Sequence, residues 1–314
     1  MEQTRPETGG NSNVQKKKKA GNERAAAAAT AFLAILVALF LMLEALLSTL
    51  DPVGNSPFFR KNDYEKTIAI HGTTRFDKVF YGGSNVHAAY MERLSTSGYV
   101  DFGLEYGKLT YLLTMLEKDL ITVTGDLVIG LNYFTLMDDL ETNPGYAFHR
   151  KGIEPYVFFH RNRIQNFFTD ALDNMLNGEF RLNRYHELDK YRYHGVWTDE
   201  RLDARLIAHE ERFWGLELSA FEGNLSALEK LIDFCKSNDI HLRAVWMPYN
   251  PYSPVPEIYR SVIAEASAIL AAHGIEYIDM TDAFPREYFY DMSHLNYETG
   301  AVAFTREIDI WLER

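Results

Sequence analysis

An uninterrupted apolar stretch near the N-terminus constrains this chain more than any other feature. Residues 25–50, AAAAATAFLAILVALFLMLEALLSTL, are apolar apart from Glu44 and a few hydroxyl side chains. About 20 such residues are enough to cross the hydrocarbon core of a bilayer as a helix. In lipid, a helix also satisfies every peptide group within its own segment. The stretch therefore predicts a transmembrane helix.

The flanks of this stretch indicate its orientation. Residues 1–24 are polar, contain a run of four lysines at 16–19, and are expected to be disordered. Lysines on this side favour a cytoplasmic N-terminus, which leaves residues 51–314 outside the cytoplasm. A cleaved signal peptide is the alternative, but its apolar region is usually shorter and ends in a small-residue cleavage site. We expect an uncleaved, single-pass anchor in the cell membrane that carries one extracytoplasmic domain.

Glu44 is the one charged residue inside the apolar stretch. A charge in a membrane segment is costly and usually has a partner or reaches the interface. Because Glu44 lies near the outer end, it can reach the membrane surface, or it can contact a second membrane protein. The sequence leaves both interpretations open.

Composition excludes several classes of protein. The formal net charge is −12, so general binding to the phosphate backbone of nucleic acids is not expected. The single cysteine, Cys235, allows no internal disulfide and no cysteine-clustered metal site. The segment HEERF at 209–213 departs from the H-E-x-x-H zinc pattern, because Phe213 replaces the second histidine. We expect neither a metal nor a cofactor.

Short β-rich runs alternate with longer helical ones from residue 77 onward. Candidate strands span residues 78–82, 99–103, 126–131, 242–247 and 275–280. Candidate helices span residues 108–120, 225–239 and 257–274, the last ending at a glycine. This alternation predicts an α/β fold with a doubly wound, flavodoxin-like parallel sheet of five strands. Residues 133–222 contain no clear strand and are expected to form a helical insertion.

Four motifs each follow a different predicted strand. They supply Ser84, Gly103, Gly107, Asn132, Asp291 and His294. The carboxyl ends of the strands in a doubly wound sheet meet at one edge, where such folds bind ligands. We therefore expect these residues to converge. Each motif also has a purely structural explanation, since Ser84 can be an N-cap and Asn132 can cap a turn.

The chemistry available to this set is specific. A serine hydroxyl is a poor nucleophile until a base removes its proton, and histidine is the usual base. The aspartate three residues before His294 can fix the tautomer and orientation of the imidazole. A tetrahedral oxyanion also needs fixed donors. The N–H groups of Ser84 and of a glycine, together with the Asn132 amide, are the candidates.

The set resembles the motifs of the SGNH (GDSL-like) hydrolases, which are G-D-S near the start, a glycine, G-x-N, and D-x-x-H near the end. The matching segments are GGS at 82–84, FGLEYG at 102–107, GLN at 130–132 and DMSH at 291–294. The resemblance covers residues 76–314 apart from the insertion. It differs at one point, because the aspartate between glycine and serine in the family is Gly83 here.

The resemblance assigns a role to each motif residue. It implies Ser84 as the nucleophile, with Asp291 and His294 completing the triad. It also implies an oxyanion hole made of the Ser84 N–H, the Asn132 side chain and one glycine N–H. Either Gly103 or Gly107 can be that glycine, and the sequence does not choose between them.

The Gly83 difference and the ending DMSHLNYETG (291–300) are more similar to a divergent, membrane-anchored branch of the family. That branch includes alginate O-acetylation proteins and teichoic-acid D-alanyl transfer proteins. The resemblance implies serine-dependent O-acyl transfer to, or ester hydrolysis on, a cell-envelope polysaccharide or teichoic-acid-like polymer. It further implies a membrane-bound O-acyltransferase as partner, with Glu44 as one possible contact.

Two other functions stay open at this level. The chain can be a non-catalytic scaffold that keeps the fold and binds the polymer or a synthase partner, an alternative motivated by Gly83. It can also be an accessory subunit that acts mainly through its transmembrane helix. Among aromatic residues of the insertion, Tyr185, Tyr191, Tyr193 and Trp197 are candidates for stacking on sugar faces, although interior packing explains them equally well.

Overall fold

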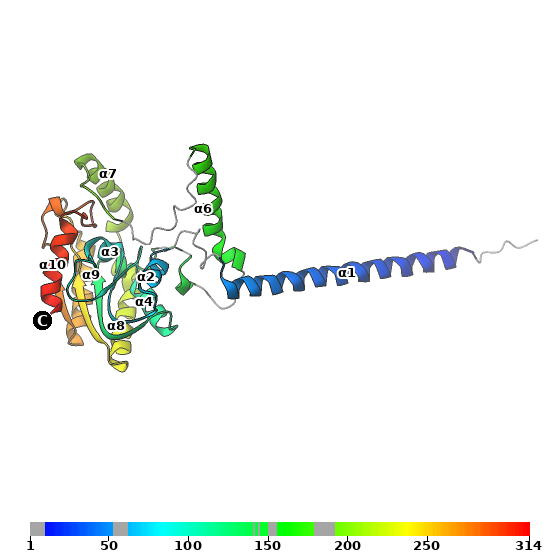
Figure 1. Cartoon of the computed structure of the whole chain (residues 1–314), viewed down its shortest axis with the longest axis horizontal. Coiled ribbons are helices and arrows are strands. Elements are labelled where there is room, and N and C mark those ends of the chain that lie inside the picture. Colours follow the sequence, from blue (N-terminus) through cyan, green and yellow to red (C-terminus); the bar gives the residue numbers. More distant parts are fainter. Residues whose placement is uncertain (1–9, 53–61, 141, 144, 150–155, 179–191) are drawn as a thin grey trace, which may run out of the picture.

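The structure, a computed structural model, describes residues 10–52, 62–140, 142–143, 145–149, 156–178 and 192–314. A central sheet lies between layers of helices, and one long helix extends away from this domain (Figure 1). The strands are β1 (Arg75–Gly82), β2 (Val100–Gly103), β3 (Thr122–Leu131), β4 (His241–Trp246) and β5 (Glu276–Asp279).

The five strands are all parallel and lie in the order β2-β1-β3-β4-β5. This order places β1 and β3 side by side with β2 on the outer edge, which is the flavodoxin-like arrangement with its switch point between β1 and β3. The structure confirms the predicted α/β fold and its five-stranded parallel sheet.

The helices are α1 (Gly10–Leu50), α2 (Asp63–His71), α3 (Ser84–Ala89), α4 (Leu109–Glu117), α5 (Tyr133–Leu136), α6 (Tyr156–Leu176), α7 (Asp199–His209), α8 (Glu222–Ser237), α9 (Glu257–Ala272) and α10 (Gly300–Leu312). Most of the helices connect the strands and cover the two faces of the sheet, whereas α1 and α6 extend away from it (Figure 1). Single 3₁₀ or π turns occur as η1 (Ala147–His149), η3 (Glu210–Trp214), η4 (Leu218–Phe221) and η5 (Arg286–Tyr288). Between β3 and α8, the described residues contain helices and turns but no strand.

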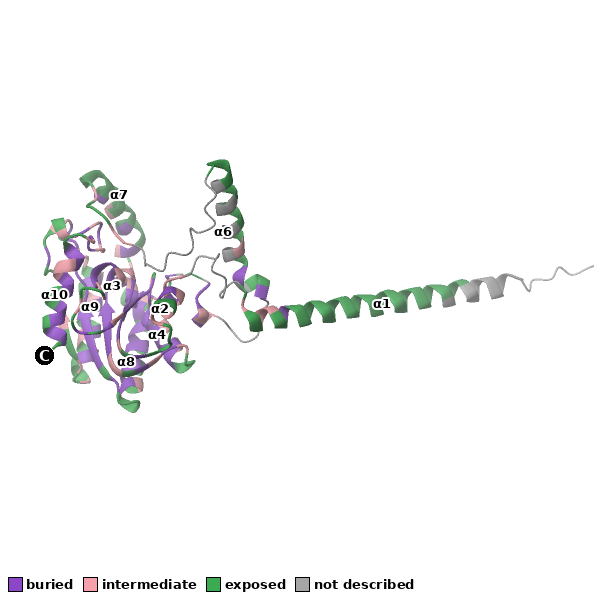
Figure 2. Cartoon of the chain, viewed as in Figure 1, coloured by how far each residue is buried: buried purple, intermediate pink, exposed green. Residues whose placement is uncertain are grey.

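Side chains alternate between the two faces along each strand, as the period of two in a strand requires. Val79 and Tyr81 of β1 belong to the large hydrophobic cluster that includes α4, α8 and α9. Phe80, between them, belongs to a second cluster that includes α3 and α10. The buried strands and the exposed surface of α1 are distinct in Figure 2. The sheet therefore separates two cores, and α3 and α10 share one face.

Helix α1 begins earlier than the sequence predicts. Residues 10–24 were expected to be disordered, but α1 runs from Gly10 to Leu50. Lysine, glutamine and alanine are good helix formers, so the apolar helix can extend back through them at little cost. Residues 1–9 lie outside the described residues. The part of α1 from Gly21 to Leu50 is long and apolar enough to cross a membrane, and its most apolar stretch is not buried against the rest of the chain.

Helices α3 and α10 are joined by polar contacts as well as by the core between them. The Thr305 hydroxyl of α10 donates to the carbonyl of Ala89 at 3.2 Å and accepts from the N–H of Met91 at 2.9 Å. The buried Asp309 carboxylate accepts hydrogen bonds from the hydroxyls of Ser95 and Ser97, at 2.7 Å each. These bonds fix the end of α3 against α10.

Glycines allow α3 to approach the ends of the strands closely. A Cβ atom at Gly82 or at Gly130 would overlap Val86 Cγ2, so the Val86 side chain sits where those two Cβ atoms would be. A Cβ at Gly103 would lie 2.5 Å from the backbone nitrogen of His87, and one at Gly107 would overlap the carbonyl oxygen of Gly82. The start of α3 is therefore seated directly on β1, β2 and β3.

We predict that Gly130→Ala destabilises the domain because the new methyl group must displace Val86 or the strand. Overpacking of this kind costs about 1–3 kcal/mol. Urea unfolding of the purified full chain, followed by tryptophan fluorescence, measures the change. Gly215→Ala is the matched control, because Gly215 has a φ of −85° and no atom within 4 Å of its would-be Cβ. Equal stability of the two variants would contradict the close seating of α3.

Candidate active site

Ser84 is the first residue of α3 and directly follows the carboxyl end of β1. Gly83 before it is extended, with φ −79° and ψ −172°, a conformation that any residue can adopt. The Ser84 Oγ lies 2.8 Å from the His294 Nε2, although 210 positions separate the two residues in the chain. This distance is within hydrogen-bond reach and suits proton transfer between a serine and its base.

Asp291 holds the other side of the imidazole. Both of its carboxylate oxygens lie 2.9 Å from the His294 Nδ1. Its Oδ1 also accepts the backbone N–H groups of Ser293 and His294, at 2.9 Å each. Burial raises the pKa of Asp291, but the charge and hydrogen bond of His294 and these N–H donors outweigh it, so the net pKa lies below the ordinary value of 3.8. Asp291 is thus ionised. Because an ionised carboxylate accepts hydrogen bonds, it keeps a proton on the Nδ1 of the His294 imidazole.

Two asparagines anchor the loop that carries this pair. The Asn250 amide donates to the carbonyl of Asp291 at 2.7 Å. The Asn296 Oδ1 accepts the N–H groups of Thr299 at 2.9 Å and Gly300 at 3.1 Å, which caps the start of α10. A Cβ at Gly300 would overlap the carbonyl of Tyr288, so this position requires glycine. The segment HLNYETG therefore connects His294 rigidly to α10.

Tyr193 also contacts the imidazole of His294. The sequence had suggested a different role for it, which was stacking on a sugar face. Its ring stacks on the ring of His294, with centroids 4.2 Å apart and planes at 11°. The Tyr193 carbonyl accepts the N–H of Tyr297 at 2.7 Å, which ties the insertion to the histidine loop. Of the other aromatic candidates, Trp197 packs against Tyr290 at 5.5 Å, and Tyr185 and Tyr191 lie outside the described residues. No sequence spacing points to the Tyr193 stack.

Asn132 combines its structural and its proposed chemical role. As the N-cap of α5, its Oδ1 accepts the N–H of Thr135 at 2.7 Å and the hydroxyl of the same residue at 2.9 Å. The cap uses only the oxygen of the amide, and Asn132 lines the same cavity as Ser84. The Nδ2 donor of Asn132 is not part of the cap.

The two candidate glycines are less suited to donate to a ligand. The N–H of Gly103 already donates to the Asp101 carboxylate at 2.9 Å, and the N–H of Gly107 donates to the carbonyl of Leu104 at 3.1 Å. Neither glycine lines the cavity around Ser84. Their visible function is steric, because Gly103 leaves room for α3 at His87 and Gly107 leaves room for the Gly82 carbonyl at the end of β1.

The space beside Gly83 is already occupied. A Cβ at Gly83 would lie 3.1 Å from the Asn85 Oδ1, which is a tight contact, and 3.4 Å from the Thr135 hydroxyl. The Asn85 Oδ1 is buried and makes no hydrogen bond within the described part of the chain. A side chain at position 83 would therefore press against the Asn85 side chain, which would have to shift. With glycine at this position, the Ser84 Oγ still lies 2.8 Å from the His294 Nε2.

A cavity of about 450 Å³ opens at Ser84 and His294. The insertion forms one wall of it through Arg205, His209 and Arg212 of the α7 and η3 segment. The described residues offer no group of three or more His, Cys, Asp or Glu side chains that could hold a metal ion.

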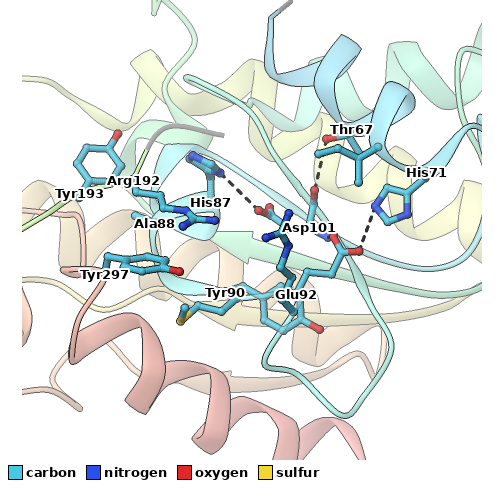
Figure 3. A pocket seen from close by; sticks show the side chains of 13 residues that line it. Thr67, His71, His87, Ala88, Tyr90, Glu92, Asp101, Arg192, Tyr193 and Tyr297 are labelled. Carbon is cyan, nitrogen blue, oxygen red and sulfur yellow. Dashed lines mark hydrogen bonds and ion pairs between the residues drawn. The ribbon is translucent and has the colours of Figure 1, made fainter. Parts of the chain in front are cut away.

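A second, smaller pocket of about 150 Å³ shares two lining residues, His87 and Tyr193, with this cavity (Figure 3). The His87 Nδ1 lies 3.4 Å from the Asp101 carboxylate there, and the His71 Nε2 lies 3.0 Å from the Glu92 carboxylate. The two pockets adjoin at His87 and Tyr193, and the smaller one combines these charged pairs with apolar side chains such as Ile70 and Met91.

Comparison with known proteins adds little to this geometry. No family model and no curated protein matches the chain. One solved structure with a similar arrangement is a "putative acylhydrolase" from Bacteroides fragilis, at 12% identity and a TM-score of 0.38. The match covers 77% of this chain and 88% of that one. Similarity at this level does not establish a shared activity.

His209 provides a pH-dependent prediction for the site. Burial is the main cause that lowers its pKa from 6.5 to about 4, and the nearby Arg205 adds to the effect. Between those two pH values the unfolded chain binds a proton that the folded chain does not, so stability falls as the pH falls from 6.5 to 4.

We therefore expect His209→Gln to be less sensitive to acid than the unmodified protein over this range. The unmodified protein should lose about 1–3 kcal/mol more between pH 6.5 and pH 4. Urea unfolding at a series of pH values measures this difference, and above pH 6.5 the gap between the two proteins should stay constant. Parallel pH profiles throughout would show that folding does not change the pKa of His209, which would contradict this account.

Proposed function

We propose that this protein is a serine-dependent O-acyltransferase or esterase that acts on a cell-envelope polymer through an acyl-serine intermediate. The observation that carries the proposal is the continuous hydrogen-bonded series from Ser84 through His294 to an ionised Asp291, with distances of 2.8 and 2.9 Å. The sequence resemblance to SGNH hydrolases supports the same chemistry.

In the first half of the reaction, the Ser84 Oγ attacks the carbonyl carbon of an acyl donor as its proton passes to the His294 Nε2. Asp291 stabilises the imidazolium that forms. The bond to the donor oxygen then breaks, and this oxygen takes the proton from the Nε2. The acyl group remains on the serine as an ester.

In the second half, a hydroxyl of the acceptor or a water molecule gives its proton to the Nε2 and attacks the acyl-serine. The tetrahedral intermediate breaks down, and the Ser84 Oγ recovers the proton. Each oxyanion needs donors that are fixed in advance. The Ser84 N–H at the start of α3 and the Asn132 Nδ2 are the two best placed, since the glycine N–H groups already have acceptors.

A polymer is the proposed acceptor because the surface extends beyond the serine. The shared lining of the two pockets at His87 and Tyr193 supports a substrate longer than one sugar or polyol unit. Arg205 and Arg212 on the wall of the larger cavity support an anionic polymer. Such a substrate would place its hydroxyl at Ser84 and its charged groups against the insertion.

The proposed location is the outer side of the cell membrane, with α1 as a single-pass anchor and the N-terminus in the cytoplasm. The apolar part of α1 and the lysine run before it support this topology. In this arrangement the acyl groups must be delivered from the cytoplasm, so we propose a membrane-bound O-acyltransferase as partner. A scaffold without catalysis is the competing function, and the next experiment separates the two.

Substitution of the proposed catalytic residues tests the chemistry. Ser84→Ala and His294→Ala should each lower the hydrolysis of an activated ester by at least about 10⁴-fold, and the double variant should be little worse because these residues act as a unit. Asn132→Ala should lose about 10²–10³-fold, the usual effect of removing one oxyanion donor.

A fluorophosphonate probe should label the unmodified protein at Ser84 but not the His294→Ala variant. Ser293→Ala removes a nearby hydroxyl and serves as the control, so this variant should still be labelled at Ser84. Folding of each variant is checked by its urea midpoint. If Ser84→Ala folds and keeps the activity of the unmodified protein, Ser84 is not the nucleophile and the proposal fails. If the unmodified protein neither hydrolyses activated esters nor reacts with the probe, the scaffold function replaces the enzyme proposal.

A further inference from the structure

Helix α6 of the insertion carries a row of apolar side chains on its surface. Six of them are between 51% and 76% exposed: Val157, Phe158, Phe168, Leu172, Met175 and Leu176. Soluble proteins rarely expose so many large apolar groups on one element, and such a surface usually marks a contact with another molecule or a membrane.

The spacing of these residues places most of them on one side of the helix. Val157, Ile164, Phe168, Leu172 and Met175 follow one another at intervals of seven, four, four and three residues. Intervals of three, four and seven keep side chains on the same face of an α-helix. We call this set the α6 stripe.

The N-terminal end of α6 is held against the outer end of α1. The Glu44 carboxylate of α1 accepts the N–H of Val157 at 3.4 Å and is only 6% exposed. The Asp51 carboxylate, just after α1, accepts the Tyr156 hydroxyl at 3.1 Å and lies 3.4 Å from the His160 Nε2. A carboxylate at a helix N-terminus also interacts favourably with the helix dipole. Glu44 thus has a partner within its own chain.

These contacts place α6 at a defined level along α1. Residues 25–43, before Glu44, would span about 28 Å as a helix, close to the thickness of about 30 Å for a bilayer core. If α1 spans the bilayer from residue 25, Glu44 lies at the outer boundary of the hydrocarbon core, and Asp51 lies about 10 Å further out, at the level of the headgroups. Figure 1 shows α6 standing across α1 rather than alongside it, so α6 extends along that surface.

We infer that α6 is an interfacial helix that lies on the outer surface of the membrane, with the α6 stripe buried among the lipid headgroups and upper acyl chains. The stripe and the apolar part of α1 then face one continuous lipid phase. Helices of this kind combine an apolar face with low overall hydrophobicity. The Arg161 guanidinium, which lies over the Phe158 ring at 4.1 Å, can reach the lipid phosphates from its position on the same helix as the stripe.

This arrangement would give the domain two attachments to the membrane. A single anchor helix leaves a domain free to rotate and tilt, whereas a second contact perpendicular to it restricts both motions. The insertion that carries α6 also provides Arg205 and Arg212 to the wall of the cavity. The inference depends on α1 spanning the membrane but not on the chemistry at Ser84.

Single-cysteine labelling of the full chain tests the inference. The native Cys235 is buried and burial raises its pKa to about 12, so it should not react with a thiol label, and the unsubstituted protein serves as the blank. Phe168→Cys and Leu172→Cys each place an environment-sensitive fluorophore in the stripe, and Met175→Cys is a further position. Ile310→Cys is the matched control, since Ile310 is apolar, 55% exposed and part of α10, which lies on the far side of the domain from α1 (Figure 1).

The labelled proteins are placed singly in nanodiscs of phosphatidylcholine and phosphatidylglycerol, so that no second copy can cover the stripe. Labels at 168, 172 and 175 should show blue-shifted emission and several-fold stronger quenching by doxyl lipids than the label at 310. Aqueous iodide should quench them several-fold less than that label. Equal iodide quenching at all positions would overturn the inference. Protection seen in native membranes but not in nanodiscs would also overturn it, because a protein would then cover the stripe.

Discussion

The site depends on one steric condition, which is that α3 sits directly on the ends of three strands. Val86 fills the space beside Gly82 and Gly130, and the backbone at His87 lies against Gly103. A side chain larger than hydrogen at any of these glycines would lift the start of α3. Since Ser84 is the first residue of this helix, the same displacement would move its hydroxyl away from His294. The glycines that follow the strands are therefore explained by packing before any role in catalysis is considered.

The base reaches the serine from the other end of the chain, and α10 connects the two. Asn296 caps α10 two residues after His294, and Thr305 of the same helix bonds to the end of α3. The imidazole is then held from three sides, by the Asp291 carboxylate, the Ser84 hydroxyl and the Tyr193 ring. Because Tyr193 belongs to the insertion, a movement of that segment would alter the orientation of the base as well as the shape of the cavity.

The sequence predicts the sheet well because each strand has a strong local pattern. The third strand was predicted to begin at residue 126, because Gly125 interrupts the β-rich run. In the structure β3 begins earlier, at Thr122. The convergence of Ser84, Asn132, Asp291 and His294 was also predictable, since all four follow strands of one parallel sheet. The sequence could not predict that Tyr193 stacks on His294, or that the N–H groups of Gly103 and Gly107 are already occupied. Both features depend on side-chain and loop positions that no spacing encodes. Residues 10–24 were predicted to be disordered but are helical in the structure. A polar composition alone does not exclude a helix that continues from an apolar neighbour.

The central claim is that Ser84 carries an acyl group during turnover. Brief incubation of the full chain with 4-nitrophenyl acetate, acid quenching and mass spectrometry of the peptides test it directly. The account predicts a burst of nitrophenol equivalent to the protein present and an acetyl group on the peptide that contains Ser84. Acetylation at another residue only, or a burst that persists unchanged in Ser84→Ala, would contradict it.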